Sequence, residues 1–124
     1  MKFYICENCG NIVTYLNEAG VPVMCCGQKM KELTAGISDG AYEKHMPIVN
    51  ITGDKVVVEV GSVEHPMVEE HHIEWIIIET TQGYQCTHLS ILDKPRAEFK
   101  LTDNAELIAA YEYCNLHGLW KNKL

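Results

Sequence analysis

The chain has 124 residues, which is enough for one ordinary domain or for a small module followed by a compact domain. Its composition, 47% hydrophobic and 22% charged, is typical of a globular protein, and no apolar run is long enough to span a bilayer, so we expect no membrane partner. The net charge is −7 with neutral histidines and the basic residues are scattered, which argues against nucleic acid as a partner because phosphate binding needs a basic patch.

The cellular compartment is predicted from the start of the chain and from its cysteines. Residues 1–5 lead straight into a cysteine motif, without the apolar stretch of a signal peptide. In a reducing compartment the six cysteines of the chain are better interpreted as metal ligands than as disulfides. We therefore expect a cytoplasmic metalloprotein.

The first 35 residues contain four cysteines in two pairs. Cys6 and Cys9 form a Cys-x2-Cys-Gly motif, in which the glycine allows backbone N–H groups to turn toward the sulfurs. Cys25 and Cys26 are adjacent, so they cannot form the same relaxed loop and should bind a metal at a distorted angle. Four thiolates favour tetrahedral iron or zinc, and a structural zinc site or a vicinal disulfide remain the alternatives.

A segment of this size cannot bury a core alone, so we expect metal binding, dimerisation or both to stabilise it. We place the domain boundary after residue 35, which gives a tetrathiolate domain over 1–35 and a second domain over 36–124. The stretch Gly36–Gly40 has the composition of a linker.

The second segment is predicted to consist mostly of strands, because β-branched and aromatic residues recur in short runs. Gln82 and Gly83 offer a hairpin turn. Short strands without intervening helical patterns indicate an all-β sandwich or barrel. The predicted strands are Lys55–Val60, Ile73–Thr81, Tyr84–Leu92 and Ala97–Leu101.

One stretch conflicts with this pattern. Residues Ala105–Tyr113 have the propensities of a helix, yet they lead directly to Cys114 and His117. In a β-sandwich this stretch should be a strand that delivers the loop with these two residues. We therefore predict a strand here.

The second segment carries five further potential metal ligands. Cys114 and His117 are three residues apart, so a thiolate and an imidazole can turn toward one ion. Three more histidines lie upstream: His45, His65 and His71. One sulfur among several imidazoles is a poor structural zinc set but suits redox iron or copper, because a single thiolate tunes such a metal.

Taken together, these motifs resemble a known family. The first segment resembles desulforedoxin, a small tetrathiolate iron protein, through Cys6, Cys9, Cys25 and Cys26. With the later motifs Glu-Lys-His-Met-Pro, His-Pro-Met-Val-Glu-Glu-His and Cys-Asn-Leu-His, essentially the whole chain resembles desulfoferrodoxin, the two-iron form of superoxide reductase. The resemblance implies a mainly β protein, in which the small tetrathiolate knuckle precedes an immunoglobulin-like antiparallel β-sandwich.

The resemblance also implies a role for each residue of the second site. The axial ligand of ferrous iron would be the Cys114 thiolate, which leaves a sixth position open for superoxide. Glu43 would occupy that position in the resting ferric state, and Lys44 would lie beside it. The four equatorial ligands would be the imidazoles of His45, His65, His71 and His117.

The same resemblance implies the reaction, the cofactors and the partners. Superoxide would be reduced by one electron to hydrogen peroxide, and the tetrathiolate iron would be an accessory electron-transfer centre. Each chain would hold two irons that alternate between Fe²⁺ and Fe³⁺, with zinc a possible substitute at the tetrathiolate site. The donor would be a rubredoxin-like protein, and the chain would form a homodimer through its first domain.

Two other classes of protein match parts of the pattern. A late Cys-x2-His after an upstream histidine also occurs in cupredoxin-like electron carriers, but no methionine follows His117 and four histidines exceed the needs of that site. The other alternative is a zinc-stabilised module without a redox role. Metal analysis with a visible spectrum separates these alternatives from a two-iron protein.

Two residues near these motifs are expected to bind no metal. Cys86 alternates with His88 in a predicted strand, and we expect it to be a buried, inert thiol. His72 should face away from the site, because the side chains of His71 and His72 point to opposite sides of an extended segment.

Overall fold

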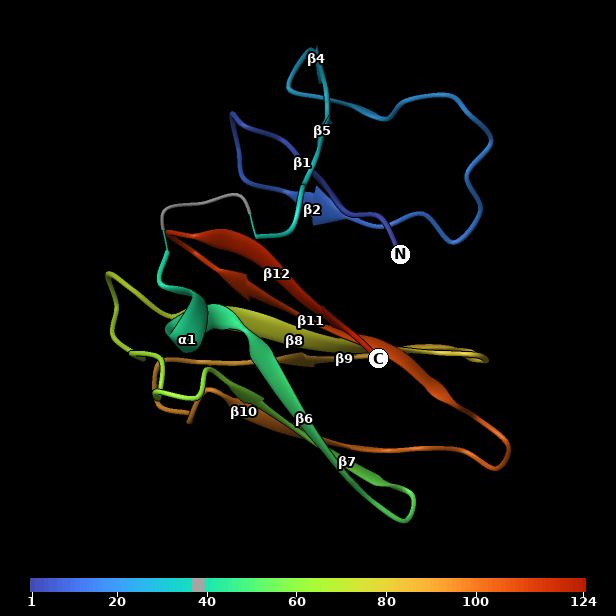
Figure 1. Cartoon of the computed structure of the whole chain (residues 1–124). Coiled ribbons are helices and arrows are strands. Elements are labelled where there is room, and N and C mark those ends of the chain that lie inside the picture. Colours follow the sequence, from blue (N-terminus) through green and yellow to red (C-terminus); the bar gives the residue numbers. More distant parts are fainter. Residues whose placement is uncertain (37–39) are drawn as a thin grey trace. The chain divides into compact units, whose positions relative to one another are not determined.

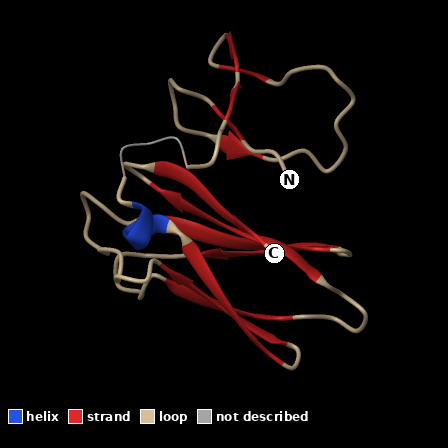
Figure 2. Cartoon of the chain, in the orientation of Figure 1, coloured by secondary structure: helices blue, strands red, loops and turns tan. Residues whose placement is uncertain are grey.

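The structure is a computed structural model that describes residues 1–36 and 40–124. The chain forms two compact units, Met1–Thr34 and Ala35–Leu124. Strands are the regular elements of the first unit and predominate in the second (Figure 2), which confirms the prediction of a mainly β fold. Residues 37–39 of the predicted linker Gly36–Gly40 lie outside the described residues.

The first unit is built from two-residue strands. They form a three-stranded antiparallel sheet of order β2-β1-β5 and a separate hairpin of β3 and β4. Phe3, Cys6 and Met30 are its buried hydrophobic residues, so a hydrophobic core supplies little of its stability. The strands are β1 (Tyr4–Ile5), β2 (Ile12–Val13), β3 (Met24–Cys25), β4 (Gln28–Lys29) and β5 (Lys31–Glu32).

The second unit is a sandwich of two antiparallel sheets that follows the short helix α1, Tyr42–His45 (Figure 1). One sheet has the order β10-β7-β6 and the other has the order β12-β11-β8-β9. This division into three and four strands is that of an immunoglobulin-like sandwich. The strands are β6 (Pro47–Thr52), β7 (Lys55–Val60), β8 (Ile73–Thr80), β9 (Gly83–His88), β10 (Arg96–Lys100), β11 (Leu107–Cys114) and β12 (Gly118–Lys123).

The core of the sandwich comes from side chains that alternate along its strands. Successive residues of a strand point to opposite faces, so every second residue of β7 and β10 can be buried. Cys114 belongs to the buried cluster between the sheets, so its position at the end of β11 is fixed by core packing. The buried cluster contains Val56, Val58, Val60, Ile73, Ile76, Ile78, Ala97, Phe99, Ala110 and Cys114.

The predicted strands agree with the structure in their cores and differ at their ends. β8 and β9 form the predicted hairpin, with Thr81 and Gln82 between the strands. β9 ends at His88, four residues before the predicted end. The stretch with helical propensity forms β11, because pairing with β8 on one side and β12 on the other outweighs local preference.

Neither β6 nor β12 is apparent in the sequence pattern. β6 begins with Pro47 and β12 begins with Gly118, which are residue types that strand interiors disfavour. Each strand forms through a neighbour: β6 pairs with β7, and β12 pairs with β11. The side-chain amide of Asn122 also donates to the carbonyl of Pro47 at 2.9 Å, which ties β12 to β6.

The prediction that Cys86 is a buried thiol is wrong. Cys86 and His88 are both exposed on β9, and the Cys86 Sγ lies 3.9 Å from His88 Nε2. The reason is the position of β9 at the edge of its sheet, where it has a neighbouring strand on one side. An alternating strand pattern alone does not reveal whether a strand is central or at an edge.

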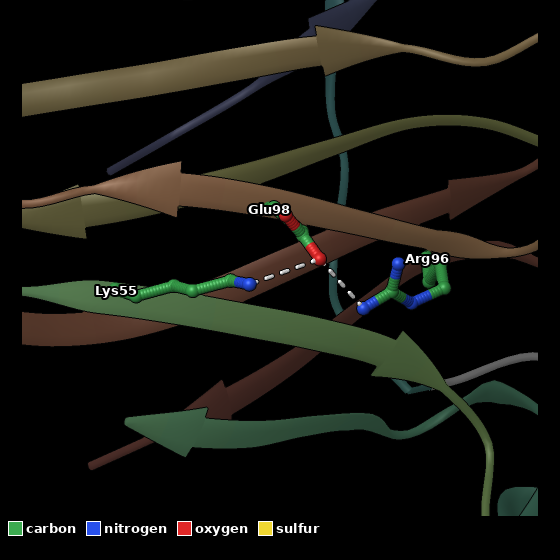
Figure 3. Close-up of polar contacts among 3 residues, drawn as sticks. All are labelled: Lys55, Arg96 and Glu98. Atoms are coloured by element: carbon green, nitrogen blue, oxygen red, sulfur yellow. Dashed lines mark hydrogen bonds and ion pairs between the residues drawn. The ribbon is translucent and has the colours of Figure 1, made fainter. Parts of the chain in front are cut away.

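Exposed ion pairs lie on the outer face of the three-stranded sheet β10-β7-β6. The Oε1 atom of Glu98 lies 3.4 Å from Lys55 Nζ and 3.0 Å from Arg96 Nη2 (Figure 3). All three side chains are well exposed to solvent, so these pairs contribute little to stability.

In the part of the chain that the structure describes, no helix has the length and apolar character needed to cross a membrane.

Candidate metal centres

Four cysteine sulfurs converge in the first unit. The ligand atoms of Cys6, Cys9, Cys25 and Cys26 all lie within 4.8 Å of one another. The sulfurs of Cys9 and Cys25 are 3.6 Å apart. In a tetrahedral site with metal–sulfur bonds of about 2.3 Å the sulfurs lie about 3.8 Å apart, so the donor set fits one iron or zinc ion.

Two tight turns present these sulfurs. The N–H of Gly10, which has a φ of 83°, donates to the carbonyl of Cys6 at 2.8 Å and closes the first loop. Cys26 and Gly27 both have positive φ, 52° and 72°, and connect β3 to β4 as in a type I′ hairpin turn. The adjacent cysteines thus differ in backbone conformation, since Cys25 ends a strand and Cys26 occupies the turn.

Hydrogen bonds shift the acidities of these thiols in opposite directions. The backbone N–H of Cys9 lies 3.5 Å from the Cys6 sulfur and, with that of Asn8, lowers the pKa of Cys6 to about 6. Hydrogen bonds with the sulfurs of Cys9 and Cys6 raise the pKa of Cys25 to about 12. A bound cation removes this competition for protons, because all four ligands then bind it as thiolates.

The five predicted ligands of the second site come from separate segments of the sandwich unit. His45 ends α1, and His65 and His71 lie in the loop before β8. Cys114 ends β11, and His117 lies in the turn before β12. The structure therefore brings together residues that are up to 72 positions apart in the sequence.

The four imidazole rings are arranged as a square. Neighbouring rings around the square have centroids 4.5–5.0 Å apart and planes 73–84° apart. Across the square, His45 and His71 are 6.1 Å apart with planes at 29°. This is the arrangement expected of four ligands in one plane around a single ion.

The inward nitrogens have the spacing of metal ligands. The Nε2 atom of His45 lies 3.2 Å from Nε2 of His65 and 3.1 Å from Nδ1 of His117. Two nitrogens that bind one ion at a right angle, with bonds of about 2.1 Å, lie about 3.0 Å apart. The spacing therefore fits a first-row metal ion between them.

Backbone carbonyls select the tautomers of two of these rings. The Nδ1–H of His45 donates to the carbonyl of Ala41, and that of His65 donates to the carbonyl of Pro66, both at 2.7 Å. Each bond leaves Nε2 unprotonated and aimed inward. Burial lowers the pKa of His45 and lowers that of His65 to about 4, so both rings are neutral at neutral pH.

His71 supplies an independent sign of a ligand. Its Nε2 atom is buried and has no hydrogen-bond partner among the described residues. Buried polar atoms without a partner are costly and rare in folded proteins. Its position in the square makes a metal ion the natural partner, and iron fits the mixed set of imidazoles and one thiolate.

Cys114 supplies the single sulfur of this site. Its Sγ lies 3.9 Å from His117 Nδ1 and within 4.8 Å of the ligand atoms of His45, His65 and His71. Burial raises the pKa of the Cys114 thiol, although the backbone N–H groups of His117 and Leu116 lower it. A cation at this position makes ionisation of a buried thiol favourable.

Two residues with no ligand atom in the site support its shape. The Trp120 ring stacks on His45 with centroids 5.0 Å apart, and its indole N–H donates to the carbonyl of His117 at 3.1 Å. A Cβ atom on Gly40 would lie 2.9 Å from the side chains of both His45 and His117. Sequence reasoning did not identify the role of Gly40, since a glycine in a linker has no specific signature.

Sequence reasoning also missed a buried carboxyl group close to Cys114. Glu112 is 0% exposed, and neither of its oxygens has a hydrogen-bond partner among the described residues. Burial raises its pKa well above the ordinary value, which favours the neutral acid. The sequence signal was a lone acidic residue at an inward position of an otherwise apolar strand.

The two predicted catalytic residues lie on α1, directly before the first ligand. Glu43 and Lys44 are exposed, and the carbonyl of Glu43 accepts the N–H of Val63 at 3.1 Å. The charge of Lys44 adds to the effect of burial in lowering the pKa of His45 and of His71. The positive charge of Lys44 therefore acts on two imidazoles of the square.

A mainly β metalloprotein with one tetrathiolate site and one imidazole–thiolate site is the class that this fold and these sites define. Residues 37–123 match the family described as desulfoferrodoxin, and residues 1–33 match the desulfoferrodoxin N-terminal domain. The chain therefore belongs to the desulfoferrodoxin family.

Individual relatives agree with this assignment. A desulfoferrodoxin from Nitratidesulfovibrio vulgaris is 46% identical over 120 residues, which cover 97% of this chain and 94% of that protein. A superoxide reductase from Pyrococcus horikoshii is 35% identical, in a match that covers 77% of this chain and 97% of the relative. The crystal structure of the superoxide reductase from Treponema pallidum is similar with a TM-score of 0.82 and 36% identity, and the match covers 98% of each chain.

The buried histidines predict how the stability of the metal-free protein depends on pH. Because His65 has a pKa of about 4 when folded, the unfolded chain binds more protons between about pH 6.5 and that value. As the pH is lowered from about 6.5 to about 4, we expect the free energy of unfolding to fall by about 3 kcal/mol from His65 alone. Urea unfolding of the metal-free protein at a series of pH values measures this.

The matched comparison is His65→Gln against His88→Gln, since His88 is exposed on β9. The His65 variant should show a weaker dependence on pH, and the His88 variant should behave like the native chain. A stability that is constant across this interval would contradict the prediction.

Proposed function

We propose that this chain is a superoxide reductase, which reduces superoxide by one electron to hydrogen peroxide at the imidazole–thiolate site. The observation that carries the proposal is the square of four imidazoles with one sulfur, a donor set suited to redox iron. The similarity of the chain to proteins named superoxide reductase supports the same reaction.

The proposed ligands of the catalytic iron are the five residues of this site: His45, His65, His71, Cys114 and His117. Superoxide needs one electron and two protons to become hydrogen peroxide. Bound ferrous iron would supply the electron at an open coordination position, with the Cys114 thiolate increasing its electron density. The carbonyl bonds of His45 and His65 hold the imidazoles in the tautomer that this ligation requires.

Lys44 and Glu43 have different proposed roles beside this position. Lys44 attracts the anionic substrate locally, because the acidic background of the protein is screened beyond about 10 Å at ordinary salt. Glu43 offers a hard carboxylate oxygen, which suits ferric better than ferrous iron. We propose that Glu43 would be a ligand of the ferric ion present after turnover and would not be a ligand of the ferrous ion.

The tetrathiolate site is proposed to hold a second iron that serves electron transfer, and zinc can replace iron there because it accepts the same four sulfurs. The electrons would come from a small rubredoxin-like donor, and failure of such a protein to reduce the oxidised chain would contradict this part. A cytoplasmic location is supported by the cysteines, since five of the six are candidate metal ligands and none is paired in a disulfide in the structure.

The reaction itself can be tested by its stoichiometry. The purified, reduced protein should consume superoxide and form hydrogen peroxide without releasing oxygen, and metal analysis should find iron in both sites. Replacing the single sulfur, Cys114→Ser, should abolish reduction and leave the visible spectrum of the tetrathiolate iron. Cys86→Ser is the matched control, because Cys86 lies exposed on β9. Oxygen release, or full activity of Cys114→Ser, would contradict the proposal.

Lys44→Ala should slow the second-order reaction with superoxide by about tenfold and leave the iron content unchanged, because it removes local attraction. Pulse radiolysis measures this rate, and the difference should shrink at high salt. Lys100→Ala is the control, since the Lys100 side chain is 81% exposed on β10. An unchanged rate for Lys44→Ala would defeat the proposed role of Lys44.

Glu43→Ala should change the visible spectrum of the oxidised form.

We also propose that the chain forms a homodimer through its first unit. This unit buries few hydrophobic residues yet exposes Leu16, Val21 and Met24 by 82%, 75% and 61%. Covering such side chains in a second copy would supply stability that so small a core lacks. Sedimentation equilibrium should give twice the mass of one 124-residue chain, and Leu16→Glu should lower it. A monomeric native protein would contradict the proposal.

A further inference from the structure

Asn115 lies between the two ligands of the β11–β12 turn and makes three hydrogen bonds to the segment that carries His71. Its side-chain Oδ1 accepts the backbone N–H of His72 at 2.8 Å. Its side-chain Nδ2 donates to the carbonyl of Glu70 at 3.0 Å. Its own backbone N–H donates to the carbonyl of His72 at 3.2 Å. Asn115 therefore holds the chain on both sides of His71.

His71 differs from two other ligands in how its ring is held. His45 and His65 each donate an Nδ1–H to a nearby carbonyl, which orients the ring. The described residues contain no corresponding hydrogen bond for the ring of His71, whose Nε2 has no partner. Apart from packing against the rings of His65 and His117, the orientation of His71 therefore depends on its backbone.

The segment around His71 also has contacts that do not involve Asn115: Nδ1 of the His72 ring lies 3.0 Å from the carbonyl of Val68, and the N–H of Ile73 donates to the sulfur of Met67 at 3.4 Å. On its N-terminal side, His71 exchanges two backbone hydrogen bonds with Val68, at 3.0 and 3.1 Å, which close a tight loop. The regular pairing of β8 with β11 begins only afterwards, with Ile73 opposite Cys114. Between that loop and β8, the three bonds from Asn115 connect the His71 segment to the Cys114 turn.

We propose that Asn115 is a positioning residue that fixes the His71 imidazole relative to the Cys114 thiolate. A primary amide suits this role because it presents one acceptor and one donor side by side, and the two bonds bracket a single residue. Asn115 lies next to Cys114 in the chain. If the segment that carries His71 shifted, the distance between the His71 imidazole and the Cys114 sulfur would change. We call the hydrogen bonds from Asn115 to Glu70 and His72 the clamp. The effect of the clamp on bound iron rests on the proposed function, whereas the clamp itself does not.

Hydrogen exchange tests the clamp directly in the metal-loaded protein. The His72 amide should be protected in the native chain and should exchange at least about tenfold faster in Asn115→Ala, which removes its acceptor. In Asn115→Asp the carboxylate still accepts this bond but cannot donate to Glu70, so His72 should remain protected. Rapid exchange of His72 in the native chain would overturn the proposal, even if Asn115→Ala failed to fold.

A spectroscopic measurement tests the effect on the site. Asn115→Ala should shift the thiolate-to-iron charge-transfer band of the oxidised protein and its midpoint potential, whereas a merely structural role would lower stability and leave both unchanged. Gln85→Ala is the matched control, because it removes a side-chain amide bond of 2.8 Å to the carbonyl of Lys100 in the same unit. This control should change neither the spectrum nor the exchange of His72.

The outcomes separate the two proposals. A native charge-transfer band and potential in iron-loaded Asn115→Ala would overturn the positioning role while the superoxide reaction stands. Conversely, a native protein that protects His72 but does not consume superoxide would contradict the proposed function and leave the clamp in place.

Discussion

The second site depends on one electrostatic constraint: imidazole nitrogens converge in a buried space and need a shared cation. The Nε2 of His45 lies 3.2 and 3.1 Å from nitrogens of two other histidines, and the Nε2 of His71 has no partner among the described residues. Lone pairs at this spacing repel unless an ion or a proton lies between them. Burial opposes protonation, so a metal ion is the stable solution.

The sandwich holds these donors at different levels of rigidity. Cys114 belongs to the hydrophobic core and lies at the end of β11, which is paired on both sides. His65 and His71 lie in a loop, where carbonyls, turns and Asn115 fix what the sheet does not. The sulfur is therefore the fixed point of the site and the imidazoles are oriented around it. The first unit lacks such a core and depends on its four sulfurs instead.

Much of the fold could be predicted because the strand cores have clear local patterns. The run of valines in β7 and the β8–β9 hairpin follow from residue type and turn chemistry. The exposure of Cys86 could not be predicted, since it depends on β9 being an edge strand. The strand β6, which begins at Pro47, likewise forms through its partner β7 and leaves no distinct local signal.

The sequence by itself determined which donor atoms this protein has and their order along the chain, because side-chain chemistry and motif spacing are local properties. It thereby indicated a tetrathiolate site and a separate imidazole–thiolate site. Only the tertiary structure decided that four imidazoles form a square with the Cys114 sulfur, since the residues come from three separate segments. The roles of Trp120, Gly40 and Asn115 likewise depended on contacts between segments distant in the sequence, which strand pairing brings together.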